Sequence, residues 1–189
     1  LLISFPVEMT KWIEPSAFYE GQWYKMADGI SGATTLGAVK EGEMQVFDLM
    51  HHLLGINSGS MGETSALLLT LGGLWLIQQR VFTWHVPVAS LLGCLLPGTL
   101  LWCFAPESTP LPLAQLTSGG LLLGAFFIAT DPVTSPTSSL GKVIFGAGFG
   151  FLVFVIRSFG NFPEGVAFAI LIMNAATPLI DTYTRQSVY

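Results

Sequence analysis

Apolar residues gather in five blocks along the second two thirds of the chain, at roughly 64–79, 86–105, 117–130, 142–156 and 164–180. An α-helix needs ~20 residues to cross the apolar core of a bilayer, and several of these blocks are shorter than that. Polar residues, Gly and Pro cluster between them, as is typical of helix ends. The pattern predicts an all-α membrane protein, a polytopic helical bundle with short or broken helices.

The ends of the blocks carry specific start and stop signals. Glu63-Thr64-Ser65 is typical of a helix start. Thr130-Asp131-Pro132 predicts a helix end, because Pro disfavours helical backbone at the residue before it. Phe162-Pro163-Glu164 predicts the start of the last helix, with Pro and an acid in the first turn. Breaks of this kind are tolerated at membrane depth where they line a cavity inside the protein.

The first third of the chain has a different character. Residues 1–5 are mostly apolar and are predicted to be the end of a preceding membrane helix. Residues 6–63 are polar and mixed, which predicts an extramembrane or interfacial segment. Within it, residues 46–56 have helical apolar spacing but are too few to span, so an interfacial or re-entrant helix is expected. Residues 64–189 then form a transmembrane bundle of about five helices.

Composition and charge narrow the class further. Only 10% of the 189 residues are charged, against about 25% in soluble domains, so lipid must cover much of the surface. The net charge of −5 and the lack of a basic run exclude nucleic acid as a partner. Cys94 and Cys103 fall on roughly opposite faces of a helix at about 100° per residue, which favours packing or lipid-facing positions over metal ligation. No metal site is predicted.

Glycine is frequent inside the apolar blocks, for example at Gly93, Gly124, Gly146 and Gly150. Small residues allow close packing between membrane helices, and this is the first interpretation. Approach of the backbone to a planar cofactor is the alternative.

One short polar stretch stands out, Asp28-Gly29-Ile30-Ser31-Gly32-Ala33-Thr34. Small residues around one hydroxyl leave room for a bulky group, and the two glycines permit a tight turn. The Asp28 side chain can orient such a turn through a hydrogen bond to the backbone. Taken alone, the stretch also fits an ordinary Ser/Gly turn.

The stretch resembles the flavinylation motif D-x-x-S-G-A-T of the RnfD/NqrB family, membrane subunits of the Rnf complex and of the sodium-pumping NADH:quinone reductase. In that family a dedicated flavin transferase joins FMN to the last Thr of the motif through a phosphoester. The resemblance therefore implies covalent FMN on Thr34, and Thr35 is the nearest alternative outside the motif. The other motif positions in this chain are Asp28, Ser31, Gly32 and Ala33.

Further segments carry the resemblance along nearly the whole chain, and they are closer to RnfD than to NqrB, in its C-terminal half. The fold implied is similar to that of urea transporters, all-helical with breaks at membrane depth. A second flavin, riboflavin, is implied in the membrane part, with no ligands assignable. The matching segments are Leu1–Met9, Gly62–Leu67, Thr83–Pro87, Gly124–Val133 and Phe162–Ile180.

Asp131 and Asp181 stand at block ends and match acidic positions of the family. An ionised acid at the bilayer centre costs ~2.5–3.5 kcal/mol on insertion scales, so an acid at depth usually has a functional role. The resemblance implies flavin contact or cation passage, and solvation at a helix end is the alternative. Asn174 either bonds a neighbouring helix or contacts flavin or ion. For Glu63 and Glu164, helix capping is favoured over an ion path.

The distribution of positive charge predicts an orientation. If all five blocks cross, Arg80, Lys142 and Arg185 lie near helix ends on one side, and Arg157 alone does so on the other. The positive-inside rule then places the Thr34 loop on the periplasmic or outer side of a bacterial inner membrane. One half-spanning helix would reverse this assignment.

The resemblance implies a subunit of an Rnf-type ion-translocating electron-transport complex, in which ferredoxin/NAD redox chemistry is coupled to Na⁺ or H⁺ movement. No P-loop or Rossmann motif occurs, so other Rnf subunits are expected to handle the soluble electron carriers. No catalytic residue and no complete active site are predicted in this chain alone. A urea-transporter-like channel and a structural membrane subunit without a redox role are the alternatives.

Overall fold

The computed structural model describes residues 12–13, 31–32, 49–55, 62, 64–105, 111–160 and 164–184. The all-helical fold class is confirmed, with one exception that the pattern did not predict: a minimal antiparallel pair of two-residue strands. The elements are β1 (Trp12–Ile13), β2 (Ser31–Gly32), α4 (Leu49–Leu54), α5 (Ala66–Gln78), α6 (His85–Phe104), α7 (Pro112–Thr117), α8 (Leu121–Leu123), the π-helix η2 (Gly124–Ile128), α9 (Ser139–Phe159) and α10 (Val166–Tyr183).

Three of these helices, α6, α9 and α10, are long and apolar enough to cross a membrane by length and composition. Helix α5 is apolar but has 13 residues. The third apolar block, 117–130, is broken near its start: α7 precedes it and ends at Thr117, Gly119 turns the chain with a φ of 65°, and α8 then passes into η2. The expectation of short and broken helices is therefore confirmed. That all five blocks cross stays a prediction.

The predicted start of the first block is also confirmed. Ser65 is the N-cap of α5, and its Oγ accepts the Leu68 N–H at 3.3 Å. The same hydroxyl donates to the Leu53 carbonyl at 3.0 Å, so one side chain caps α5 and ties α4 to it. The start of the last block differs from the prediction: α10 begins at Val166 after Gly165, so the predicted first-turn acid, Glu164, lies before the helix.

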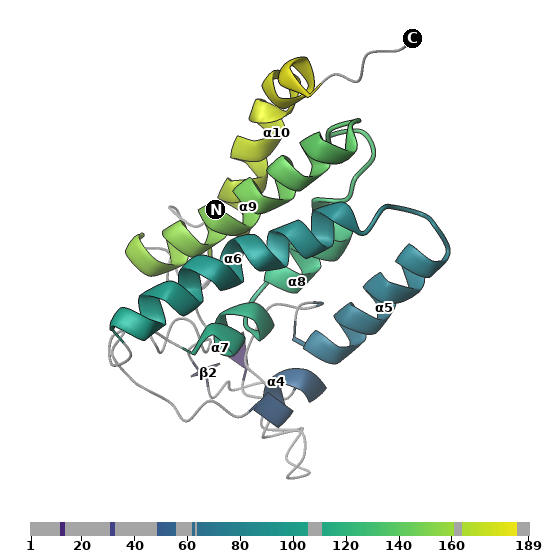
Figure 1. The fold of residues 1–189 in the computed structure, drawn as a ribbon. Coiled ribbons are helices and arrows are strands. Elements are labelled where there is room, and N and C mark those ends of the chain that lie inside the picture. Colours follow the sequence, from purple (N-terminus) through teal and green to yellow (C-terminus); the bar gives the residue numbers. More distant parts are fainter. Residues whose placement is uncertain are drawn as a thin grey trace.

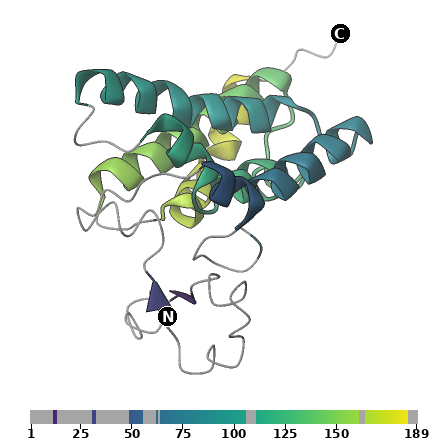
Figure 2. The same ribbon diagram turned by 90° about the horizontal axis from the view of Figure 1, so that it is seen from below.

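Helices α6 and α9 pack against each other in parallel, side by side in both views (Figures 1 and 2). A Cβ added at Gly146 would lie 2.6 Å from the Val86 carbonyl oxygen, and one at Gly150 would meet the Ser90 carbonyl oxygen. Because residue numbers increase in the same direction along both helices in these contacts, the two helices are parallel. Packing through small residues is thus confirmed for these glycines.

The other segments alternate in direction around this pair, so the bundle has two ends. Lys142 lies in the first turn of α9 and Arg157 in its last, about 22 Å apart at 1.5 Å per residue. Around Arg157 lie α4, α7 and the start of α10. Around Lys142 lie the end of α5, the start of α6, the loop after η2 and the end of α10. We call these the Arg157 end and the Lys142 end.

The core lies between α6, α8, α9 and α10, where Phe145, Phe149 and Leu121 are completely buried. Large apolar side chains also cover the outer faces of the long helices. Leu96 and Leu100 of α6 and Leu171 of α10 are 59–65% exposed. Apolar faces this extensive require lipid or a partner subunit rather than water. Cys94 is buried and Cys103 exposed, as their spacing predicts.

Candidate functional sites at the two ends of the bundle

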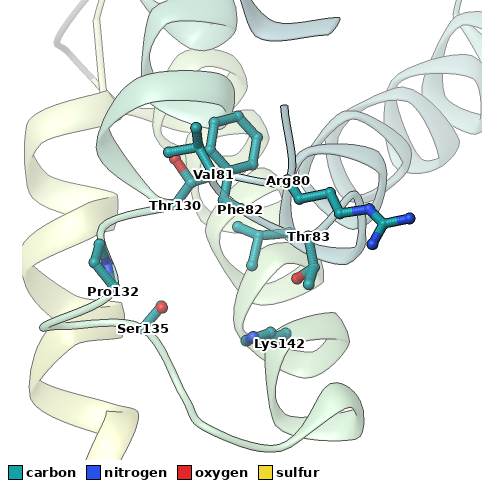
Figure 3. A pocket seen from close by; sticks show the side chains of 9 residues that line it. Arg80, Val81, Phe82, Thr83, Thr130, Pro132, Ser135 and Lys142 are labelled. Carbon is teal, nitrogen blue, oxygen red and sulfur yellow. The ribbon is translucent and has the colours of Figure 1, made fainter. Parts of the chain in front are cut away.

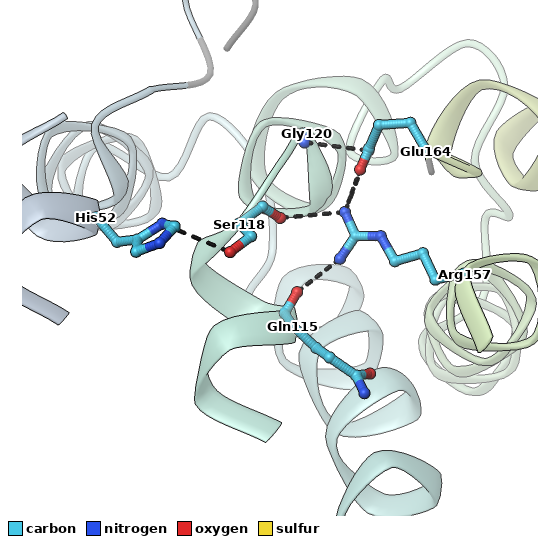
Figure 4. Close-up of polar contacts among 6 residues, drawn as sticks. All are labelled: His52, Gln115, Ser118, Gly120, Arg157 and Glu164. Carbon is cyan, nitrogen blue, oxygen red and sulfur yellow. Dashed lines mark hydrogen bonds and ion pairs between the residues drawn. The ribbon is translucent and has the colours of Figure 1, made fainter. Parts of the chain in front are cut away.

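Arg157 organises the first of the two ends (Figure 4). Its side chain is only 3% exposed although it closes an apolar helix. One guanidinium nitrogen donates to the Gln115 carbonyl at 2.6 Å, and the other to the Ser118 carbonyl at 3.2 Å. These are carbonyls left over at the end of α7, which a helix cannot satisfy itself. The guanidinium therefore closes the break in the third block from a different helix.

Glu164 balances the charge of Arg157. Its carboxylate forms a salt bridge to Nη2 of Arg157 through Oε1, with Oε2 of the same group at 3.1 Å. It also accepts the Gly120 N–H at 3.3 Å, just after the turn. Instead of capping α10, the favoured interpretation, Glu164 joins α9 to the turn between α7 and α8. A Cβ at Gly119 would collide with this carboxylate, so the turn needs glycine for space as well as for its positive φ.

Two further polar side chains complete the Arg157 end. His52 of α4 is 5% exposed, and its Nδ1 lies 3.5 Å from Ser118 Oγ. Gln115 is 3% exposed, and its Oε1 has no hydrogen-bond partner among the described residues; the same holds for Arg157 Nε. The cluster thus couples the segment entering the bundle to the break and to α9.

The Lys142 end contains a cavity of about 160 Å³ (Figure 3). Two cations, Arg80 and Lys142, contribute to its lining together with the hydroxyl-bearing residues Thr83, Thr130 and Ser135. Neither cation has an ion pair within the described part of the chain. The two ends therefore differ: one holds a buried and paired cation, and the other holds two accessible and unpaired ones.

Arg80 occupies an unusual backbone position. Its φ is 57°, the only positive value at a described residue other than glycine. The Arg80 N–H donates to the Ile77 carbonyl at 2.9 Å and the Val81 N–H to the Leu76 carbonyl at 3.1 Å. These two bonds define a Schellman motif, whose left-handed position is usually glycine. Arg80 thus places a charged side chain at a backbone position where glycine, which has no side chain, would be more stable.

The two predicted acids lie at the Lys142 end, and they differ in how they are used. Both carboxylate oxygens of Asp131 are engaged, by the Val133 N–H at 3.3 Å and the Thr134 hydroxyl at 3.1 Å. Asp181 uses Oδ1 alone, which accepts the Thr137 N–H at 3.0 Å and its hydroxyl at 3.4 Å. Oδ2 of Asp181 has no partner in the described part of the chain. Their roles in flavin or cation contact stay predictions.

Asn174 lies within α10, near the level of Thr177, whose hydroxyl donates to the Thr134 carbonyl at 2.9 Å. The Asn174 Oδ1 is buried and has no partner among the described residues. An unsatisfied buried carboxamide oxygen costs about 1–3 kcal/mol, so a donor from outside the described residues is expected. This fits either interpretation of Asn174, helix contact or ligand contact.

Of the predicted flavin site, the structure describes only the backbone of Ser31 and Gly32. Asp28, Ala33 and Thr34 lie outside the described residues, as do residues 1–5. The strand pairing sets Gly32 opposite Trp12 and Ser31 opposite Ile13. Trp12 and Ile13 therefore lie beside Ser31 and Gly32 of the motif.

Sequence reasoning missed the Arg157–Glu164 pair. A signal was present: an Arg near the end of an apolar helix, seven residues before an acid that itself opens a helix. A guanidinium buried this deeply requires a paired charge. The charge count treats Arg157 as a solvated helix-end cation, because spacing alone does not reveal burial. The described residues contain no group of three or more potential metal ligands.

The long apolar helices, their exposed apolar faces and the paired charges inside the bundle define a multi-pass α-helical membrane protein. A family model described as NQR2, RnfD, RnfE matches residues 1–189. The chain therefore belongs to the NQR2, RnfD, RnfE family.

Its relatives include proteins from three bacteria that are named as a subunit of the ion-translocating oxidoreductase complex. The chain is 47% identical to that of Stutzerimonas stutzeri, with 100% of this chain and 60% of the relative covered. It is 42% identical to that of Alcanivorax borkumensis, covering 100% and 59%, and 41% identical to that of Escherichia coli strain SE11, covering 100% and 62%. The chain thus spans about three fifths of the length of these relatives.

Proposed function

We propose that this chain belongs to a membrane subunit of an Rnf-type electron-transport complex and carries FMN covalently on Thr34 as an electron carrier. The observation that carries the proposal is the D-x-x-S-G-A-T motif at residues 28–34, within a chain whose relatives are named as a subunit of an ion-translocating oxidoreductase complex. FMN would supply the redox chemistry. The protein would supply attachment, orientation and an apolar surround.

The strand pairing supports a structural role for the residues around Trp12. Gly32 stands two positions before Thr34, and Trp12 is its partner across the strands. The pairing restricts the backbone of Ser31 and Gly32, just before Thr34 in the sequence. Such restriction favours a fixed position for a group attached at Thr34, because less conformational freedom is lost when the flavin docks.

The two ends of the bundle support an orientation with Thr34 on the outer side of a bacterial inner membrane. Arg80 and Lys142 share one end, as the positive-inside count assumes. Arg157, the opposing charge in that count, is buried and neutralised by Glu164. A paired, buried cation has little effect at the membrane surface, so the imbalance increases. The Lys142 end would face the cytoplasm.

In the complete complex, we propose that other Rnf subunits and a flavin transferase are the partners, and that electron flow between ferredoxin and NAD drives Na⁺ or H⁺ movement. Riboflavin in the membrane part is proposed on the resemblance alone. Of the two candidate acids for a cation path, Asp181 is supported better, since Oδ2 of its carboxylate is available. A channel without redox function remains the rival.

Denaturing electrophoresis of the full-length protein, made together with its flavin transferase, tests the attachment. We expect a flavin-fluorescent band that survives denaturation and disappears in Thr34→Ala. Thr35→Ala is the matched control, since it removes a neighbouring hydroxyl of the same kind, and it should keep its fluorescence. In the tryptic peptide between Lys25 and Lys40, fragmentation should place the added FMN on Thr34.

Three results would overturn the proposal. A band without fluorescence, from protein made with an active transferase, would favour the channel or a structural subunit. Fluorescence lost in Thr35→Ala but kept in Thr34→Ala would assign the attachment to Thr35 instead of Thr34. Solute flux that changes in Thr34→Ala while flavin stays normal would point specifically to the channel.

A further inference from the structure

The cavity at the Lys142 end has no role in the proposed electron transfer. It is bounded by the end of α5, the start of α6, the loop after η2 and the first turn of α9. Figure 3 shows Thr83, Ser135 and Lys142 around its lower part, and the Arg80 guanidinium extending outward from its rim. Since α6 and α9 both begin here, the cavity lies where membrane-crossing helices end, at the level of the lipid headgroups.

The charges of this cavity are uncompensated within the described part of the chain. Arg80 and Lys142 form no ion pair there. Asp131, next to the lining residue Thr130, directs both carboxylate oxygens to Val133 and Thr134 in its own loop. The starts of α6 and α9 add the positive ends of two helix dipoles. All of these features favour an anion.

The hydroxyls of the lining add hydrogen-bond donors. Thr83 and Ser135 make no side-chain hydrogen bond within the described residues, so both hydroxyls are available. Thr130 instead bonds the Phe126 carbonyl at 2.7 Å. Two cations and two free hydroxyls form a donor set suited to phosphate oxygens, which only accept hydrogen bonds.

The backbone conformation of Arg80 also supports a role in anion binding. A non-glycine residue in a left-handed conformation costs roughly 1–2 kcal/mol, and the Schellman motif itself needs only glycine there. Backbone stability therefore gives no reason for an arginine here, whereas a role for its charge does. Lys142 likewise stands in the first turn of α9, where the helix dipole disfavours a cation.

We propose that this cavity binds the phosphate group of an anionic phospholipid, held between Lys142 and the Arg80 rim. A basic cavity between membrane helices at the headgroup level is suited to such a ligand. Its volume of about 160 Å³ accommodates a phosphate with a few waters, and the acyl chains would extend along the exposed apolar faces of α5 and α6. The proposal is independent of the flavin on Thr34.

The test uses the full-length protein, delipidated in a neutral detergent, and three probes: dioctanoyl phosphatidylglycerol, dioctanoyl phosphatidylcholine and inorganic phosphate. We expect phosphatidylglycerol to raise the thermal midpoint of unfolding in a saturable way. Phosphatidylcholine and inorganic phosphate should raise it less. Arg80→Gly and Lys142→Gln should each raise the Kd for phosphatidylglycerol about five-fold, which corresponds to ~1 kcal/mol per cation. Lys40→Gln, with the same charge change in the N-terminal segment, should leave Kd unchanged.

Three outcomes overturn the proposal. Equal binding of phosphatidylcholine would remove the role of the anionic charge, and equally tight inorganic phosphate would assign the cavity to a soluble anion. An unchanged Kd in both cavity variants would place the lipid elsewhere. Arg80→Gly also removes backbone strain, so this variant should have a raised thermal midpoint in the absence of lipid. A raised Kd together with a raised thermal midpoint would show that binding is lost without misfolding.

Discussion

The two ends of the bundle use the same residue types in opposite ways. At the Arg157 end, a guanidinium is buried, paired with Glu164 and bonded to two carbonyls. At the Lys142 end, two cations line an open cavity and have no ion pair among the described residues. Composition does not separate these cases. Burial decides which charge stabilises the fold and which is available to a ligand or to the membrane surface.

The comparison also explains why Arg157 is present at all. The break at residues 118–120 leaves carbonyls of α7 without helical partners. In a membrane bundle, water does not reach most such groups, so another segment must satisfy them. Arg157 does this from α9, and Glu164 returns the charge balance. A helix break that is buried from water thus requires polar partners such as these.

The largest effect is expected from Arg157→Ala. Removing one partner of a buried pair costs about 3–5 kcal/mol; the partial exposure of Glu164 reduces this, so we expect about 3 kcal/mol. Unfolding of the full-length protein in mixed micelles, followed by circular dichroism, measures the change. Glu164→Gln is the companion variant: it keeps an acceptor for the Gly120 N–H but leaves the buried Arg157 guanidinium without a paired charge, so it should also destabilise the protein. Equal stability of Arg157→Ala and wild type would contradict the structural role.

The close contact between α6 and α9, which run between the two ends of the bundle, should be sensitive to added volume. Gly150→Ala places a methyl group against the Ser90 backbone, and such overpacking costs about 1–3 kcal/mol. The control is Gly148→Ala on the same helix, where the added group meets only the flexible end of Met173, 2.8 Å away. It should be near neutral in the same unfolding assay. Similar costs for both would show that α6 and α9 pack less closely.

The helical blocks and the Ser65 cap could be predicted from the sequence, because both depend on local spacing and local chemistry. The Arg157–Glu164 pair could not, since it needs three segments brought together by the fold. For the third block, 117–130, the pattern predicts only a short helix. The structure instead has a turn at 118–120 followed by α8 and η2, and a further short helix, α7, before the block. Nothing in the apolar pattern marks where an i to i−5 bond, such as Ala129 N–H to the Gly124 carbonyl at 2.7 Å, replaces the α-helical one.

At the Lys142 end, one substitution should stabilise the protein instead of destabilising it. Arg80→Gly should stabilise the protein by about 0.5–1 kcal/mol, because relief of the left-handed backbone cost exceeds the added freedom of glycine in the unfolded chain. The same unfolding assay, in lipid-free detergent, measures it. Arg80→Ala is the control: it removes the same charge but keeps the backbone cost, so it should give no gain. A loss of stability in Arg80→Gly would mean that the guanidinium itself supports the fold.

The smallest change in stability is expected from Asp181→Asn. An amide oxygen can keep both bonds to Thr137, so the free energy of unfolding should change by less than about 0.5 kcal/mol. Asp131→Asn must lose one of its two acceptors and should cost about 1 kcal/mol. The function of the complex should show the opposite order.

If the free Oδ2 of Asp181 contacts the transported cation, Asp181→Asn in the assembled complex will lower ion uptake into vesicles while subunit content stays normal. Asp131→Asn will keep uptake in proportion to the complex that assembles, because its oxygens already serve the loop. Uptake that survives in Asp181→Asn would assign both carboxylates to helix-end contacts. The exposed charges of the Lys142 end would then act only at the membrane surface, and the cation path would have to pass through residues elsewhere.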